Sequence, residues 1–130
     1  MILVDTAVWI DHFRDGDRQL TELLDSSVVL AHAWVIGELA LGNLRGRVEI
    51  LRLLADLPQA TIATPAELLA LIEHRRLYGI GIGYVDAQLL AATMLTDGAT
   101  LWTRDRRLNA AAQQLDVAYT PKTSRLRRSV

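Results

Sequence analysis

The N-terminal stretch Ile2-Leu3-Val4-Asp5-Thr6 decides the fold that this sequence predicts. Its three apolar residues lead without alternation into a carboxylate and a threonine. Such a run is typical of a strand buried on both faces, as in the middle of a parallel sheet. Thr6 is suited to cap a following helix, because its hydroxyl can accept from free N–H groups of the first turn. Asp5 is therefore expected at the carboxyl end of a central strand, where open α/β sheets bind their ligands. The alternative is that Asp5 is merely part of the helix cap.

Short apolar runs and helical segments alternate along the rest of the chain. This order is typical of a mostly parallel sheet with helices on both faces. We therefore predict an α/β fold in which residues 1–120 form one domain and 121–130 a basic, loosely ordered tail. The expected strands are 2–4, 28–31, 61–63, 99–103 and 117–119, and the expected helices are 8–14, 18–25, 33–45, 48–57, 65–77, 85–95 and 108–115.

The composition limits the classes of protein to which the chain can belong. With 130 residues, 51% of them apolar, it has the size and core of a single domain. No cysteine is present, which excludes disulfides and thiolate metal sites. No apolar run approaches the roughly 18 residues of a membrane span, and Asp5 interrupts any signal peptide. We expect a cytoplasmic protein without membrane contact.

The net charge of −1 is unevenly distributed. Residues 102–130 carry seven basic and two acidic side chains, a net charge of +5, which leaves −6 on the other residues. A basic C-terminal end can attract phosphate or an acidic partner. It can equally be a solvated tail, and composition alone does not choose between the two.

Four carboxylates stand at positions where the predicted fold can bring them together. Asp5 and Asp105 follow buried strands, Asp86 opens a helix, and Glu38 projects from a helix rich in apolar residues. Carboxylates that converge repel one another unless cations neutralise them. Ligation by oxygen alone suits Mg²⁺ or Mn²⁺, and such ions clamp phosphate oxygens and activate water. This pattern suggests a metal-dependent phosphodiesterase or phosphatase; four unrelated acids are the other interpretation.

Three glycines, Gly79, Gly81 and Gly83, stand at alternate positions just before Asp86. They do not form a dinucleotide fingerprint, which requires G-x-G-x-x-G directly after a strand. We interpret them as a flexible connection that lets the backbone pass close to a site.

The segments around the four acids resemble the PIN-domain family, and most closely the VapC toxins of bacterial toxin–antitoxin pairs. The resemblance implies a PIN-like three-layer fold around a central, mostly parallel sheet of four to five strands. It also implies an endoribonuclease, dependent on Mg²⁺ or Mn²⁺, that hydrolyses RNA and inhibits translation. The implied partners are the RNA substrate, a VapB-type antitoxin whose C-terminal segment occupies the active-site groove, and a second copy in a homodimer or a toxin–antitoxin hetero-oligomer. The segments are 2–10 (ILVDTAVWI), 35–42 (VIGELALG), 81–92 (GIGYVDAQLLAA) and 101–105 (LWTRD).

The resemblance also implies roles in the site for individual residues. Thr103 matches a family position whose hydroxyl orients a carboxylate or a water behind the ligands, and Thr6 is expected in the same supporting role. At Ala7 the chain departs from the family, whose members commonly have serine there, so one hydrogen bond that supports the metal is expected to be missing. The acidic quartet of metal ligands and catalytic residues is Asp5, Glu38, Asp86 and Asp105.

Three arginines, Arg104, Arg106 and Arg107, flank Asp105. They can contact RNA phosphates, pair with an acidic segment of the antitoxin, or simply solvate the helix. All three interpretations stay open at the level of sequence.

Two other functions are compatible with the sequence. A phosphatase or a DNA nuclease can use the same acidic site, although Ala7 stands where a haloacid-dehalogenase-type phosphatase needs its second aspartate. From a different class, the chain can be a catalytically silent PIN-like module that acts by binding protein. Retention of four mutually repelling acids argues against the silent module.

Overall fold

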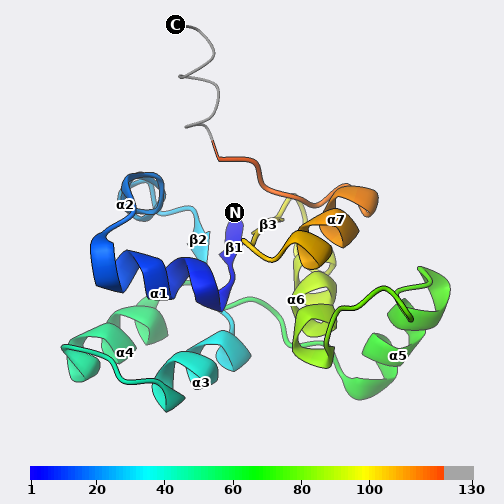
Figure 1. The fold of residues 1–130 in the computed structure, drawn as a ribbon, viewed down its shortest axis with the longest axis horizontal. Helices are drawn as coiled ribbons and strands as arrows, with labels where there is room; N and C mark the ends of the chain where they lie inside the picture. Colours follow the sequence, from blue (N-terminus) through cyan, green and yellow to red (C-terminus); the bar gives the residue numbers. More distant parts are fainter. Residues whose placement is uncertain (122–130) are drawn as a thin grey trace, which may run out of the picture.

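A three-stranded parallel sheet lies at the centre of the chain, with β1 between β2 and β3. The computed structural model describes residues 1–121. In Figure 1, α1 to α4 lie on one side of this sheet and α5 to α7 on the other. The strands are β1 (Ile2–Val4), β2 (Val29–Leu30) and β3 (Thr100–Trp102), and the helices are α1 (Thr6–Asp15), α2 (Arg18–Asp25), α3 (Ala33–Leu41), α4 (Arg47–Asp56), α5 (Pro65–His74), α6 (Tyr84–Met94) and α7 (Arg106–Gln114).

The prediction for the N-terminal strand is confirmed. Leu3 pairs with Leu30 on one side and Leu101 on the other, so β1 is hydrogen-bonded along both edges. Leu3 and Val4 have no solvent exposure, as expected for a strand covered on both faces. The α/β fold class with helices on both sides of a parallel sheet is therefore confirmed, and Asp5 does follow its central strand.

The expected four to five strands are not all formed. Residues 61–63 were predicted to be a strand, but the backbone of Ala63 bonds instead to the buried side chain of Gln88, at 2.8 and 3.1 Å. Parallel pairing on that edge is limited to a single bridge between Ala31 and Gln59. Residues 117–119 likewise make one bridge, between Leu101 and Ala118. Each edge of the sheet thus gains one isolated bridge and no further strand, and the bridge at Gln59 lies before the predicted range 61–63.

Helix boundaries differ from the expected ones where capping decides them. The prediction that Thr6 caps α1 is wrong, because Asp5 is the N-cap and its Oδ1 accepts from the N–H of Thr6 at 2.7 Å. The predicted start of α5 is confirmed, since Thr64 and Glu67 form a capping box with Pro65 at the first helical position, but the helix ends at His74 and not at 77. Helix α2 also begins and ends where the sequence predicted.

The core joins the sheet to helices from both sides. Trp9 of α1, Leu3 of β1, and Leu89 and Leu90 of α6 are fully buried in one cluster. Seven consecutive residues of α6, from Ala87 to Thr93, are buried, so this helix is held on every side. A helix fixed in this way holds its first turn, which carries Asp86, in place against the sheet.

Among the described residues, no helix is both long and apolar enough to cross a membrane. The basic tail was predicted for 121–130, and residues 122–130 lie outside the part of the chain that the structure describes.

Candidate active site

Asp5 lies at the carboxyl end of β1 and begins α1. Its N–H donates to the carbonyl of Trp102 at 2.9 Å, which continues the pairing of β1 with β3. Its two carboxylate oxygens accept from different segments, Oδ1 from the N–H of Thr6 and Oδ2 from the hydroxyl of Thr103. The strand and the helix cap therefore fix this carboxylate in one orientation.

Thr103 connects the two strand ends that carry acids. Its hydroxyl donates to Asp5 Oδ2 at 2.7 Å and accepts from the N–H of Asp105 at 3.1 Å. Thr103 is only 7% exposed, so water has little access to either hydrogen bond. The supporting role expected of Thr103 matches this geometry.

Glu38 is exposed on α3 and faces the start of α1. The Thr6 hydroxyl donates to its Oε1 at 2.6 Å. Thr6 thus contacts the acidic site through Glu38, although it does not cap α1. Exposed Ala7 stands where the family commonly has serine, while Asp5 already accepts from both Thr6 and Thr103.

Asp86 and Asp105 each occupy the beginning of a helix. Asp86 lies in the first turn of α6, and its Oδ2 accepts from the N–H of Gly83 at 3.0 Å. Asp105 is the N-cap of α7, and its Oδ1 accepts from the N–H groups of Arg107 and Leu108 at 2.9 and 3.0 Å. The positive ends of the two helices stabilise both charges.

The four carboxylates influence one another electrostatically. Burial raises the pKa of Asp5 above its ordinary value, and the charges of Glu38 and Asp105 raise it further, against the lowering effect of its hydrogen bonds. Burial also raises the pKa of Asp86, and the charges of Asp5 and Asp105 add to this effect. Asp5 is therefore close enough to Glu38, Asp86 and Asp105 to interact with their charges, and a cation would relieve this repulsion.

Within residues 1–121, no three acidic or histidine side chains already converge as a set that could hold a metal ion. The donor chemistry nevertheless fits a hard cation, because all the available ligands are carboxylate oxygens. In the described chain, one oxygen each of Glu38, Asp86 and Asp105 makes no hydrogen bond. These oxygens, together with the unused lone pairs of Asp5, are available for coordination.

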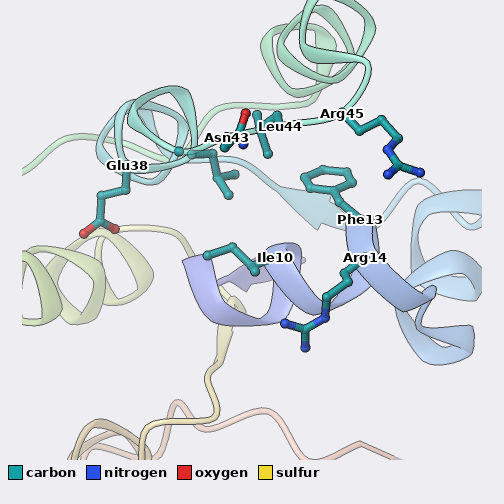
Figure 2. Close-up of a pocket in the computed structure, with 9 residues that line it drawn as sticks. Ile10, Phe13, Arg14, Glu38, Asn43, Leu44 and Arg45 are labelled. Carbon is teal, nitrogen blue, oxygen red and sulfur yellow. The ribbon is translucent and has the colours of Figure 1, made fainter.

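A pocket of about 390 Å³ opens beside Glu38, between α1 and the connection from α3 to α4. Figure 2 shows Phe13 and Ile10 on α1 facing Asn43 and Leu44, with Glu38 at one end and Arg45 at the other. Leu39 of α3 completes the apolar lining. The pocket thus joins an apolar surface and basic groups to the acidic site.

The three arginines near Asp105 have different surroundings. Arg104 pairs with Asp11 and Asp17 and lies over the ring of Trp102, 5.9 Å from its centroid. Arg106 is exposed and makes no side-chain hydrogen bond or ion pair with residues 1–121. Arg107 is exposed as well, and its side chain packs on Gly81. The three arginines were predicted to share the same possible roles, but only Arg104 is paired with carboxylates in the described chain.

Two contributions of the glycine-rich connection were not assigned from sequence. The N–H of Gly83 holds Asp86, and Gly81 makes room for Arg107. The alternating glycines were the available signal, and they were interpreted only as letting the backbone pass close to a site. At Gly81 a close approach does occur, although it involves a side chain from α7.

Comparison with known proteins gives consistent matches over most of the chain. The sequence model of the PIN domain matches residues 2–114. The chain is 49% identical over 124 residues to "Ribonuclease VapC32" from two strains of Mycobacterium tuberculosis, which covers 95% of this chain and 100% of the relative. The crystal structure of FitAcB from Neisseria gonorrhoeae superposes with a TM-score of 0.64 and 28% identity, over 91% of this chain and 95% of that one.

A second solved structure, FitAB bound to an IR36 DNA fragment, matches with a TM-score of 0.62 and 26% identity over 91% of this chain and 92% of that one. The family model and the 49% identical relative each cover nearly the full length of the described fold. The chain therefore belongs to the PIN-domain family and is of the VapC type.

Proposed function

We propose that the chain is a metal-dependent endoribonuclease that acts as the toxin of a toxin–antitoxin pair, hydrolysing RNA phosphodiester bonds and thereby inhibiting translation. The observation that carries this proposal is the Thr103 hydroxyl, which joins the carboxylate of Asp5 to the backbone of Asp105 at adjacent strand ends. Burial raises the pKa of both Asp5 and Asp86, and the charge of Asp105 adds to the rise at each. Titratable groups perturbed by burial and by like charges are typical of functional sites. The 49% identity to a protein named as a ribonuclease supports the choice of RNA as substrate.

We assign Asp5, Glu38, Asp86 and Asp105 as the residues that hold a divalent cation, Mg²⁺ or Mn²⁺. When bound, such an ion polarises phosphate oxygens and lowers the pKa of an attacking water. The free oxygens of Glu38, Asp86 and Asp105 supply ligand positions, while Asp5 is oriented from β3.

The chain's own residues orient the acids. The Thr103 hydroxyl fixes Asp5, and the Thr6 hydroxyl fixes Glu38. The N–H groups of α7 hold Asp105, and the N–H of Gly83 holds Asp86. Hydrogen bonds that fix acidic groups in advance reduce the rearrangement that the reaction requires.

We further propose that the pocket beside Glu38 receives a segment of the antitoxin. The pocket combines an apolar lining from Ile10, Phe13 and Leu44 with Arg14 and Arg45. A peptide with apolar anchors and acidic flanks is complementary to such a surface. Co-purification of the wild type and of Phe13→Ala with a VapB-type antitoxin tests this part. Light scattering measures whether the assembly is a homodimer or a hetero-oligomer.

The central experiment is cleavage of total RNA by the purified protein in Mg²⁺, in Mn²⁺ and in EDTA, with the RNA ends mapped. Asp5→Asn and Asp86→Asn should abolish cleavage while the protein remains folded. Glu22→Gln, at an exposed acid of α2, is the control and should retain activity. Cleavage that persists in both aspartate variants would overturn the assignment of the site.

One observation favours the silent protein-binding module that the sequence left open: in residues 1–121 no three acids are yet arranged to hold a metal. Calorimetric titration with Mn²⁺ separates the two functions. Binding by the wild type and weak or no binding by Asp86→Asn supports the nuclease, whereas no binding by either protein, with no RNA cleavage, supports the silent module.

A further inference from the structure

The arginines next to the acidic site differ in whether their charge is already neutralised. Arg104 is engaged by two carboxylates, Asp11 and Asp17. Arg107 has no carboxylate within 4.0 Å of its side-chain nitrogens anywhere in residues 1–121. An arginine without an internal partner keeps its five N–H donors and its charge for a ligand.

Arg107 contacts Asp105 directly and, at Gly81, the segment that positions Asp86. Its backbone N–H donates to Oδ1 of Asp105 at 2.9 Å. Its side chain crosses the glycine-rich connection at Gly81, two residues before Gly83, whose N–H holds Asp86. The arginine therefore spans the segments that position Asp105 and Asp86.

Gly81 is the residue that allows this packing. A Cβ at Gly81 would lie 2.5 Å from Nη1 and 2.8 Å from Cδ of Arg107, closer than side-chain atoms approach. Gly81 also has a φ of +85°, a conformation that other residues rarely adopt. Neighbouring Gly79 has a similar φ of +72°, but a Cβ there would meet no atom within 4 Å.

We propose that Arg107, whose side chain lies in the space left by Gly81, contacts a phosphate of the RNA strand beside the four carboxylates. This inference rests on the proposed ribonuclease function. Four acids repel a polyanion, and an arginine beside them adds positive charge to that of the proposed metal ion and gives the strand a second point of attachment. The guanidinium fits this task, because its planar donors bind phosphate bidentately.

The first test measures RNA binding and cleavage for Arg107→Gln and Arg107→Lys. Binding is measured in the Asp86→Asn background, so that the RNA stays intact. Arg107→Gln should weaken binding about tenfold and flatten the dependence of log K on log salt by about 0.7, the value for one lost phosphate contact on a single strand. Arg107→Lys should recover part of the affinity and most of the salt slope. Arg52→Gln, at an exposed arginine of α4 with no described partner, is the control and should match the wild type.

The second test uses the glycines. Gly81→Ala should displace the Arg107 side chain and reduce cleavage, whereas Gly79→Ala imposes comparable backbone strain without touching Arg107. In the double variant Gly81→Ala/Arg107→Gln, cleavage should fall no further than in Arg107→Gln alone. Additive losses would show that Gly81 acts independently of Arg107 and would overturn the packing argument.

The outcomes separate this inference from the proposed function. If the wild type cleaves RNA and Arg107→Gln binds and cleaves like Arg52→Gln, only the role of Arg107 is overturned. If the wild type cleaves no RNA in either metal, the ribonuclease function fails, and the inference fails with it. Circular dichroism of each variant confirms folding, and if Gly81→Ala does not fold, the comparison of glutamine with lysine at 107 decides.

Discussion

The hydroxyl of Thr103 donates a 2.7 Å hydrogen bond to Oδ2 of Asp5, although 98 positions separate the two residues in the chain. The hydroxyl oxygen of Thr103 in turn accepts from the N–H of Asp105 at 3.1 Å. The pairing of β1 with β3 places Asp5 and Asp105 at adjacent strand ends. The buried Thr103 hydroxyl then fixes the orientation of the Asp5 carboxylate relative to the backbone of Asp105.

Replacing Thr103 by valine should damage the site more than it damages the fold. Valine has nearly the same shape but leaves the N–H of Asp105 without its acceptor and frees Oδ2 of Asp5. The loss in unfolding free energy should be about 1–3 kcal/mol, and RNA cleavage or metal affinity should fall about 10- to 100-fold. Thr103→Ser retains the hydroxyl and should stay close to the wild type in urea denaturation and in cleavage assays. Equal activity of the valine and serine variants would contradict the role of the hydroxyl.

The acidic cluster should destabilise the metal-free protein as the pH rises. The pKa of Asp5 is raised in the folded state, first by burial and then by Glu38 and Asp105, so the folded protein binds protons more readily than the unfolded chain. Ionisation therefore costs stability as the pH rises from the ordinary value of 3.8 through the raised value, and this cost persists above it. Asp5→Asn removes the ionisation and should be more stable than the wild type at neutral pH in EDTA.

Urea denaturation of both proteins across this pH range measures the difference that belongs to Asp5. The difference should be largest at neutral pH, shrink in acid, and shrink or reverse when Mg²⁺ or Mn²⁺ is added, because only the wild type gains the stabilisation from metal binding. A difference that does not change with pH would contradict the raised pKa.

Arg104 should act on stability rather than on RNA. It joins Asp11 of α1 and Asp17, the N-cap of α2, to the end of β3, with its side chain 38% exposed. Arg104→Gln should cost about 1 kcal/mol of unfolding free energy at low salt, and less at 1 M salt, where exposed ion pairs are screened. Arg14→Gln removes a more exposed partner of the same Asp11 and should cost less. A salt-independent loss would point to packing against Trp102 instead.

The sequence predicted elements wherever local chemistry decides them. The apolar run before Asp5 gave the central strand, and the Thr64–Glu67 pair gave the start of α5. The prediction failed where a residue distant in the chain determines the local structure. The backbone of Ala63 bonds to the side chain of Gln88 and does not pair as the expected strand. The prediction also failed where two adjacent residues compete, as Asp5 takes the cap predicted for Thr6. The four acids as one site remain a prediction from the sequence, and the contact of Arg107 with Gly81 joins segments that no local pattern relates.

His32 should make the protein sensitive to mild acid. It is fully buried at the N-terminus of α3, the helix that carries Glu38, and its Nδ1 accepts from the N–H of Trp34 at 2.9 Å. Burial lowers the pKa of this imidazole below its ordinary value, although an interaction with Gln88 opposes the shift. As the pH falls below about 6.5, the unfolded chain binds a proton that the folded state resists, so the free energy of unfolding should decrease.

Protonation would also convert Nδ1 from an acceptor into a donor, which removes the cap of α3 and disturbs the helix that positions Glu38. His32→Asn keeps an acceptor at the N-cap but cannot titrate, so it should be less stable than the wild type at neutral pH because it leaves a cavity. Its stability should nevertheless decrease less between pH 7 and pH 5. If urea denaturation shows that both proteins lose the same unfolding free energy between pH 7 and pH 5, the acid sensitivity comes from another group.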